Sequence, residues 1–84
     1  MFDDFFSGKI CIFEENIDYV GNDLKGVLVK NQYECANNCV VEPQCLGFTY
    51  NQNNKKCWMK SKVNNRNTVH RAISGTCKHQ GYGK

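Results

Sequence analysis

Several features are scarce in this sequence of 84 residues, and each shortage excludes a class of protein. Its apolar runs are far shorter than the stretch of about 18 residues that a membrane-spanning helix needs, so the chain does not cross a bilayer by itself. The length is that of one domain, which excludes large enzymes and multidomain machines. Proline occurs once, at Pro43, and no Asp or Glu follows Glu42.

The start of the chain lacks the pattern of a signal peptide. Residues 1–6 read Met-Phe-Asp-Asp-Phe-Phe, with no basic segment and no apolar stretch after it. An Asn-x-Ser/Thr acceptor for N-glycosylation is also missing. We expect a module of a larger secreted or surface protein, in which residues 1–8 are a leader or linker remnant and residues 79–84 a flexible tail.

Cysteine, by contrast, is abundant. An even number of cysteines in so short a chain predicts a disulfide framework and therefore an oxidising compartment. The competing interpretation is a zinc site, but the usual Cys-x-x-Cys knuckle does not occur here, so we expect no metal and no cofactor. Spacing alone leaves every pairing open among Cys11, Cys35, Cys39, Cys45, Cys57 and Cys77.

Charge is distributed unevenly along the chain. Residues 1–42 carry all eight acids and three lysines, a net charge of −5, whereas residues 43–84 carry eight bases and a net charge of +8. A basic stretch without interleaved acids can attract sulfated glycans, anionic membranes or acidic proteins. The alternative is that these are ordinary solvated charges on a small secreted domain.

The first third of the chain predicts two short strands. The apolar runs at Lys9–Phe13 and Val27–Val29 are of strand type. Residues 16–26 between them are rich in Asn, Asp and Gly and predict turns.

Residues 32–41 predict a helix that ends before the single proline. Asn31 is a candidate N-cap, and Glu34 follows it at nearly the spacing of a capping box. Cys35 and Cys39 lie one turn apart on the same helix face. They are poorly placed to bond each other within a regular helix, so each needs a distant partner.

The second half predicts a hairpin and one further strand. Leu46–Tyr50 alternates apolar and small residues, as a half-buried strand does, and the polar turn 51–54 leads into a returning strand at Lys55–Lys60. We expect a basic loop over residues 61–68, a last strand over residues 69–73 and then a turn. The whole predicts an α+β domain, with three aromatic residues in its core: Tyr33, Phe48 and Trp58.

Five motifs taken together resemble a PAN/apple domain. They are Asp18-Tyr-x-Gly-x-Asp-Leu24, Glu34-Cys-Ala-x-x-Cys39, Cys45-x-Gly-Phe-Thr-Tyr-Asn51, Lys56-Cys-Trp-Met-Lys60 and Ser74-Gly-x-Cys77. The resemblance covers residues 9–78. It is strongest to the apple domains of apicomplexan microneme adhesins, in the superfamily that includes the prekallikrein and factor XI apple domains and the N-terminal domain of hepatocyte growth factor.

This resemblance implies a curved antiparallel sheet of about five strands with one helix packed across it. It also implies the pairings Cys11–Cys77, Cys35–Cys57 and Cys39–Cys45. Those bridges would bring Glu34 beside the Lys55-Lys56 pair, so part of the acidic half would offset part of the basic half. The stretch from Lys60 to Arg71 would then be the unbalanced surface.

The sequence predicts a binding module and not an enzyme. Oxidised cysteines cannot act as nucleophiles, the serines lack a nucleophile elbow, and adjacent carboxylates on a strand face opposite ways. An exposed tyrosine can stack on a sugar ring, although core packing is the alternative for Tyr50. The candidate ligand-binding residues are Lys55, Lys56, Lys60, Lys62, Arg66, Arg71 and Tyr50.

The resemblance implies recognition of a cell-surface glycan, a glycoprotein or a partner protein. It further implies a secreted parent chain with tandem apple domains, stored in an organelle such as the microneme and used in adhesion to host cells. An extracellular site disfavours nucleic acid as a ligand. A protein–protein module or a structural spacer without glycan binding remains the alternative.

Overall fold

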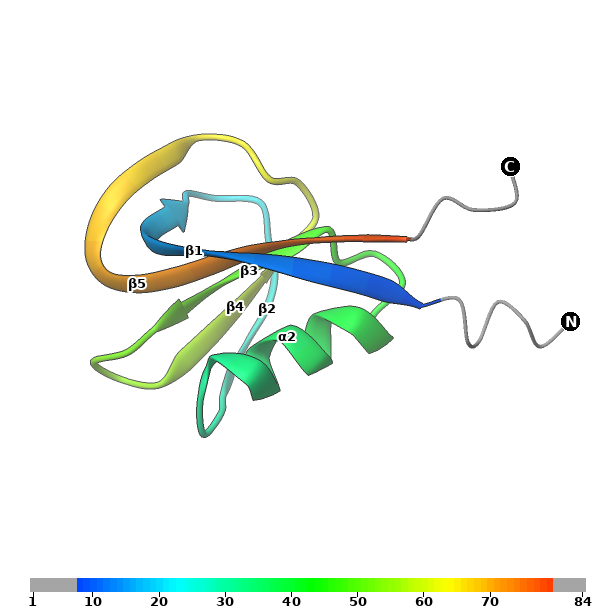
Figure 1. The fold of residues 1–84 in the computed structure, drawn as a ribbon, viewed down its shortest axis with the longest axis horizontal. Coiled ribbons are helices and arrows are strands. Elements are labelled where there is room, and N and C mark those ends of the chain that lie inside the picture. Colours follow the sequence, from blue (N-terminus) through cyan, green and yellow to red (C-terminus); the bar gives the residue numbers. More distant parts are fainter. Residues whose placement is uncertain (1–7, 80–84) are drawn as a thin grey trace, which may run out of the picture.

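The computed structural model describes residues 8–79, and their strands form one antiparallel sheet (Figure 1). The sheet order is β1-β5-β3-β4-β2, with helix α2 across one face. This confirms the predicted α+β fold, whereas the expected leader and tail lie almost wholly outside the described residues. The elements are β1 (Lys9–Tyr19), β2 (Asp23–Leu28), α2 (Gln32–Val41), β3 (Gly47–Asn51), β4 (Lys56–Lys60) and β5 (Arg66–His79).

Helix α2 begins and ends where the local sequence predicts. The side chain of Asn31 accepts hydrogen bonds from the backbone N–H groups of Tyr33 and Glu34, each at 3.0 Å. The carboxylate of Glu34 accepts in turn from the N–H of Lys30, one residue before the N-cap. Two donors that the first turn cannot satisfy within the helix are therefore capped, and the start of the helix is fixed.

Two of the three disulfides hold the helix against the sheet, and the third joins the first strand of the chain to the last. Cys35–Cys57 links α2 to β4, and Cys39–Cys45 links the end of α2 to the segment before β3. Cys11–Cys77 joins residues directly opposite each other on β1 and β5. All three pairings are those that the resemblance implies.

The antiparallel pair formed by β1 and β5 is longer than predicted. It bends and curls over the sheet (Figure 1). Its register shifts between Glu15 and Ile17, where Asn16 and Arg71 both have positive φ, at 60° and 69°. The Asn16 side chain accepts a hydrogen bond from the Arg71 N–H at 3.1 Å. Pairing therefore continues beyond the bend, and the turns predicted over residues 16–26 and 74–75 are wrong over most of their length, as is part of the predicted loop 61–68.

Strand β3 is buried on both faces, which corrects the prediction of a half-buried strand. The curled part of the β1–β5 pair covers the face opposite the helix. There the Thr49 hydroxyl accepts a hydrogen bond from the Tyr19 N–H at 3.2 Å. Thr49 also bonds the Ser74 hydroxyl at 2.7 Å, and Ser74 donates to the Ile17 carbonyl at 2.5 Å. These polar side chains are buried but fully paired, so their burial leaves no unsatisfied group.

The aromatic core is smaller than predicted. Phe48 is fully buried and packs edge-on against Phe13, with ring centroids 5.6 Å apart. Tyr33 instead lies on the outer side of Phe13 and is 66% exposed, and Trp58 is 36% exposed. The prediction that both lie in the core is therefore wrong; on α2 the inward positions belong to Cys35, Ala36 and Cys39.

A buried lysine joins the start of the sheet to the end of the helix. The Lys9 ammonium donates to the backbone carbonyls of Cys39, Glu42 and Cys45, at 3.0, 2.6 and 2.6 Å. A cation there complements the negative end of the helix dipole. Burial lowers the pKa of Lys9, and the Glu42 carboxylate opposes that shift.

Replacing Lys9 by Met tests how much this contact stabilises the fold. The variant keeps the apolar stem but leaves three carbonyls without their cation, so we expect a loss of about 2 kcal/mol in the free energy of unfolding. Urea denaturation measures it, with the exposed Lys25→Met as the matched control. A loss in Lys9→Met no larger than in the control would contradict the capping role.

Candidate functional site

Tyr50 is part of the core and not of a binding surface. It is 3% exposed, and its hydroxyl donates to the Lys30 carbonyl at 3.4 Å. The core alternative considered for this residue is the one that the structure has, because β3 lies in the middle of the sheet under the helix. Tyr50 is therefore removed from the candidate ligand contacts.

Two of the basic candidates are occupied by acids from the first half of the chain. The side chain of Lys60 is 4% exposed and forms an ion pair with Asp23 at the start of β2. Arg66 donates from Nε and Nη2 to the two carboxylate oxygens of Glu14, at 3.2 and 2.6 Å. The expectation that the Lys60–Arg71 stretch is unbalanced is therefore wrong for Lys60 and Arg66, whereas Lys62 and Arg71 form no ion pair within residues 8–79.

The remaining basic candidates separate into two places. Lys62 follows the end of β4, whereas Lys55 precedes the strand and Lys56 is its first residue, so the length of a five-residue strand, roughly 15 Å, lies between them. Arg71 joins the second group: its carbonyl accepts from the Gln52 N–H at 3.1 Å and its Nε donates to Asn53 at 2.8 Å.

Lys55, Lys56 and Arg71, with the turn 51–54 between β3 and β4, form what we call the hairpin-end surface. Lys55 and Arg71 are exposed, and Lys56 is half-buried. The two ion pairs present within residues 8–79 involve none of these three cations. No ion pair joins Glu34 to Lys55 or Lys56 either, so the implied offset of these two lysines by Glu34 is not found. The hairpin-end surface is consequently a cluster of cations with amide neighbours.

Trp58 lies beside this surface. The Lys56 ammonium is 5.0 Å from the centroid of the indole ring, a cation–π contact. Gly26 on the neighbouring strand β2 makes room for the ring, because a Cβ there would approach the indole to 2.7 Å. Trp58 is the chain's single tryptophan, so its fluorescence reports on events at Lys56.

The Glu14 carboxylate stabilises the curled part of the β1–β5 pair through its contacts with Arg66 and Tyr19. The pKa of Glu14 lies below its usual value of 4.5, first because Arg66 donates to the carboxylate and second because the Tyr19 hydroxyl does so at 2.7 Å. Burial raises the pKa of Tyr19, whose hydroxyl also bonds Thr76 at 3.1 Å. Glu14 thus connects the two curled ends of β1 and β5.

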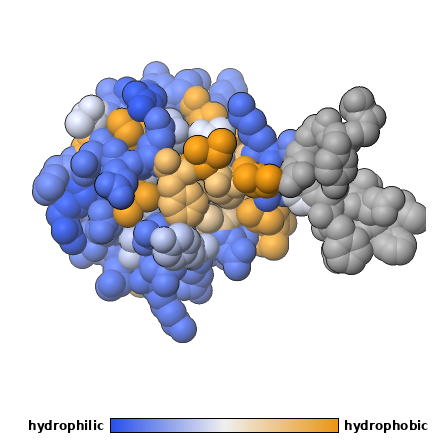
Figure 2. Space-filling model, viewed as in Figure 1, coloured by the Kyte–Doolittle hydropathy of each residue, from blue (hydrophilic) through white to orange (hydrophobic). Residues whose placement is uncertain are grey.

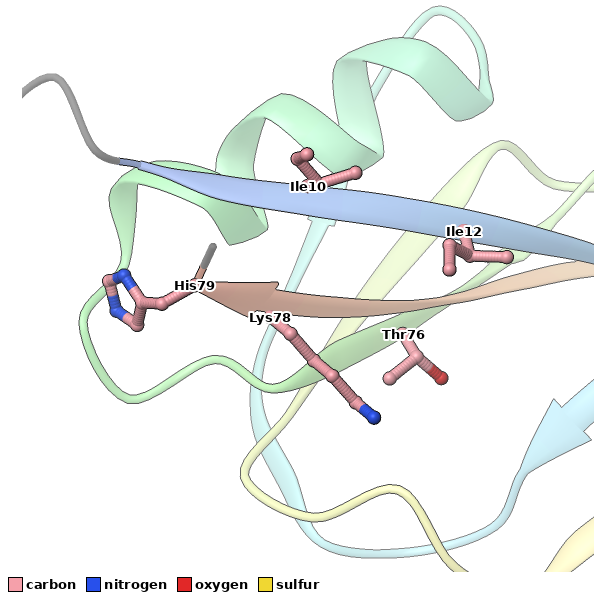
Figure 3. Close-up of a pocket in the computed structure, with 5 residues that line it drawn as sticks. All are labelled: Ile10, Ile12, Thr76, Lys78 and His79. Carbon is pink, nitrogen blue, oxygen red and sulfur yellow. The ribbon is translucent and has the colours of Figure 1, made fainter. Parts of the chain in front are cut away.

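A groove of about 350 Å³ opens where the first strand, β1, pairs with the last strand, β5, and we call it the terminal groove. Figure 3 shows Ile10 and Ile12 on β1 and Thr76, Lys78 and His79 on β5 as its lining. Ile10 and Ile12 are 51% and 69% exposed, because the alternating Cys11 and Phe13 take the inward positions. Sequence reasoning missed the groove, although this alternation is visible in the sequence.

The hairpin end and the terminal groove differ in character. The view in Figure 2 shows hydrophilic surface over most of the hairpin end, while hydrophobic surface gathers toward the end where the chain leaves the sheet. A smaller groove of about 240 Å³, lined by Leu46 and Val63, shares Thr76, Lys78 and His79 with the terminal groove. The apolar area therefore continues past β5.

Comparison with known proteins identifies the family. The sequence matches the family profile described as PAN domain over residues 11–81, which is most of the chain. This chain belongs to the PAN domain family. Microneme antigen L2 of Sarcocystis muris is 38% identical to it over 48 residues, covering 57% of this chain and 35% of that protein. The aligned part of this chain therefore spans about a third of that protein's length.

Family and fold support an adhesion-type module. PAN domains are typically non-catalytic binding modules, and three disulfides in a small domain are typical of secreted or extracellular proteins. Within residues 8–79 no helix has the length and apolar character needed to span a membrane.

The contact between Glu14 and Arg66 makes stability depend on pH in the acid range. Because the pKa of Glu14 is lowered in the folded protein, its stabilising contribution is present above about pH 4.5 and is lost as the pH falls through the folded pKa. We expect Glu14→Gln to be less stable than the parent at neutral pH and to lose less stability on acidification. Thermal unfolding from about pH 7 to pH 2 measures this difference.

The neighbouring exposed residue gives the control. Glu15 forms no ion pair within residues 8–79, so Glu15→Gln should reproduce the acid response of the parent. Equal acid responses of the Glu14 and Glu15 variants would show that the Arg66 contact does not stabilise the fold.

Proposed function

We propose that this PAN domain is an adhesion module that binds anionic carbohydrate on a cell surface through the hairpin-end surface. The observation that carries the proposal is the group formed by Lys55, Lys56 and Arg71, in which no cation is paired with a carboxylate of residues 8–79. Cations without acidic partners attract sulfate and carboxylate groups over a distance of several ångströms.

The neighbouring side chains suit a saccharide better than a bare anion. Asn53 and Asn54 are exposed in the turn, and their amides can donate to and accept from sugar hydroxyls. Beside them the indole of Trp58 presents an apolar ring next to the Lys56 cation. An anionic group on Lys55 or Arg71 and a sugar ring near Trp58 would use both features at once.

The relationship to a microneme antigen supports the biological setting. We propose that the parent protein is secreted, carries tandem apple domains and contacts host cells, with residues 9–78 as one domain and Lys62 outside the binding surface. Residues at the hairpin end are far from Lys9 and His79, which pair at the opposite end of the sheet. A large ligand could therefore reach the hairpin end without meeting neighbouring domains.

Removing two exposed cations tests the carbohydrate site. We expect Lys55→Ala/Arg71→Ala to bind heparin about tenfold more weakly, since each exposed ion pair contributes roughly 0.2–1 kcal/mol. Binding of the parent should weaken steeply between about 0.05 and 0.5 M NaCl as the charges are screened. Isothermal titration measures the affinity, and quenching of Trp58 fluorescence reports whether the ligand is near Lys56.

A variant of equal charge separates a site from general attraction. Lys25→Ala/Lys62→Ala removes the same charge from exposed positions away from the hairpin end and should retain most of the affinity. Equal losses in both variants would indicate diffuse charge attraction. No binding of the parent to heparin at low salt or to a broad glycan array would exclude the glycan function and favour the protein-binding alternative.

A further inference from the structure

One side of β1 is a free edge of the sheet. β1 stands first in the sheet order and pairs with β5 alone among the strands of residues 8–79. Cys77 donates its N–H to the Leu46 carbonyl at 2.9 Å, so the backbone groups of Cys77 point to β3 and not to β1. Cys11 therefore faces Cys77 in a pair without mutual hydrogen bonds, which agrees with their short Cα–Cα distance of 4.0 Å. The N–H and C=O of Cys11 point instead to the free edge.

Open backbone groups recur at every second residue of this edge. Since the orientation alternates along a strand, Lys9 and Phe13 also point their N–H and C=O outward, while Ile10 and Ile12 bond to β5. The outward groups of Lys9, Cys11 and Phe13 have no hydrogen-bond partner within residues 8–79. Such a row of donors and acceptors is a template for a further strand.

The stretch from Lys9 to Phe13 lacks the features that usually protect a sheet edge. Natural edges carry charged side chains, prolines or bulges that hinder pairing with another chain. Lys9 is the one charged residue of this stretch, and its ammonium is turned away to the carbonyls at the end of α2. The register shift of β1 comes only after Glu15. The edge is therefore open to a partner strand.

Apolar side chains flank the open edge on both faces of the sheet. Ile10 and Ile12 expose theirs in the terminal groove on one face (Figure 3). On the other face the exposed ring of Tyr33 packs on Phe13, with centroids 5.6 Å apart. Helix α2 lies mainly over β3 and β4 and so leaves room beside β1. An added strand would therefore bury apolar surface as well as form hydrogen bonds.

The charges along this edge favour a second copy of the same domain as the occupant. Lys78 and His79 lie at one end of the β1–β5 pair, whereas Glu14 and Glu15 lie at the other end of its part before the bend. Two copies of β1 that pair antiparallel place the basic end of each copy beside the acidic end of the other. A strand with opposite charges at its two ends is thus complementary to itself.

We propose that two copies of this domain pair antiparallel through the free edges of β1, with Cys11 of one copy opposite Cys11 of the other. A two-fold axis then sets the outward groups of Lys9 opposite those of Phe13, so every open donor meets an acceptor. This pairing is independent of carbohydrate binding, because the hairpin-end surface lies at the far end of the sheet and stays uncovered.

The side chains on the groove side select this register. Ile10 of each copy lies beside Ile12 of the other, so four isoleucines form one apolar cluster across the axis. Lys78 lies on the same face as Glu14 of the second copy. Sliding the strands by two residues would set Ile10 opposite Glu14 in one direction, or Ile12 opposite Gly8 in the other, and either shift separates the isoleucine pairs.

Analytical ultracentrifugation of the full chain tests the association. The contact is smaller than a standard interface, so we expect a monomer–dimer equilibrium between about 10 µM and 1 mM. Ile12→Lys should weaken the dimer at least about tenfold, because the two-fold axis doubles the loss of apolar contact. Leu28→Lys is the matched control: Leu28 is 73% exposed on the opposite edge strand β2, and its replacement should leave the equilibrium unchanged.

Amide hydrogen exchange tests whether the edge itself is paired. As the protein concentration rises, the N–H groups of Cys11 and Phe13 should exchange more slowly, whereas that of Ile12, which already bonds to β5, should keep its rate. Leu28 on the free edge of β2 is the internal control and should also keep its rate. Its N–H points away from β4, because the next residue, Val29, donates toward that strand.

Charge reversal tests the register. Lys78→Glu would bring a carboxylate toward Glu14 of the second copy and should weaken the dimer several-fold. Lys62→Glu makes the same change of charge after the end of β4 and should not. Equal affinities of these two variants would exclude the stated register.

Three other results would overturn the proposal. One is a parent chain that stays monomeric at about 1 mM, and another is an equal loss of dimer in Ile12→Lys and Leu28→Lys, which would place the contact elsewhere. The third is slow exchange of the Cys11 and Phe13 amides at every concentration, since the edge would then be covered by residues of the same chain.

Discussion

The pairing of the first strand with the last is the constraint on which the rest of this structure depends. β1 and β5 pair from Lys9 opposite His79 to Glu15 opposite Ile73, and Cys11–Cys77 fixes that register covalently. The bridge closes the longest loop in the chain, 66 residues apart, and so restricts the unfolded state most. Once this register is set, Lys9 lies at the end of α2 and β5 lies beside β3.

The same register explains how part of a strongly divided charge distribution is neutralised across the fold. Beyond the bend at Asn16 the β1–β5 pair curls over the sheet, and this curl brings Glu14 and Arg66 together. At the other edge, β2 pairs with β4 and brings Asp23 to Lys60. Two acids from the first half therefore neutralise two bases from the second half where strands run side by side. Among the cations that form no ion pair within residues 8–79, Lys55, Lys56 and Arg71 lie together at the turn between β3 and β4.

Local rules predicted what depends on neighbouring residues. The helix bounds followed from an N-cap at Asn31, and the hairpin of β3 and β4 followed from alternation around a polar turn. Disulfide pairing came from the family resemblance and not from spacing. The lengths of β1 and β5 could not be predicted, because Asn16 and Arg71 make their bend through a contact 55 residues apart.

Burial of individual side chains was the least predictable part of the candidate site. Lys60 and Tyr50 looked like surface candidates because a basic residue and a tyrosine favour solvent or interfaces in general. Their burial depends on partners distant in the sequence, Asp23 for Lys60 and Lys30 for Tyr50. Conversely, Tyr33 is exposed because two cysteines and Ala36 occupy the inward face of its helix.

The arrangement of the sheet also separates the two surfaces that can take part in recognition. Lys9 and His79 are register partners, so the chain enters and leaves the domain at one end, beside the terminal groove (Figure 1). The turn between β3 and β4 lies at the other end. Any segment or domain joined to either end would therefore meet the apolar groove first, while the cationic turn would stay open to ligands. The apolar groove and the free hairpin end thus both follow from the single pairing of β1 with β5.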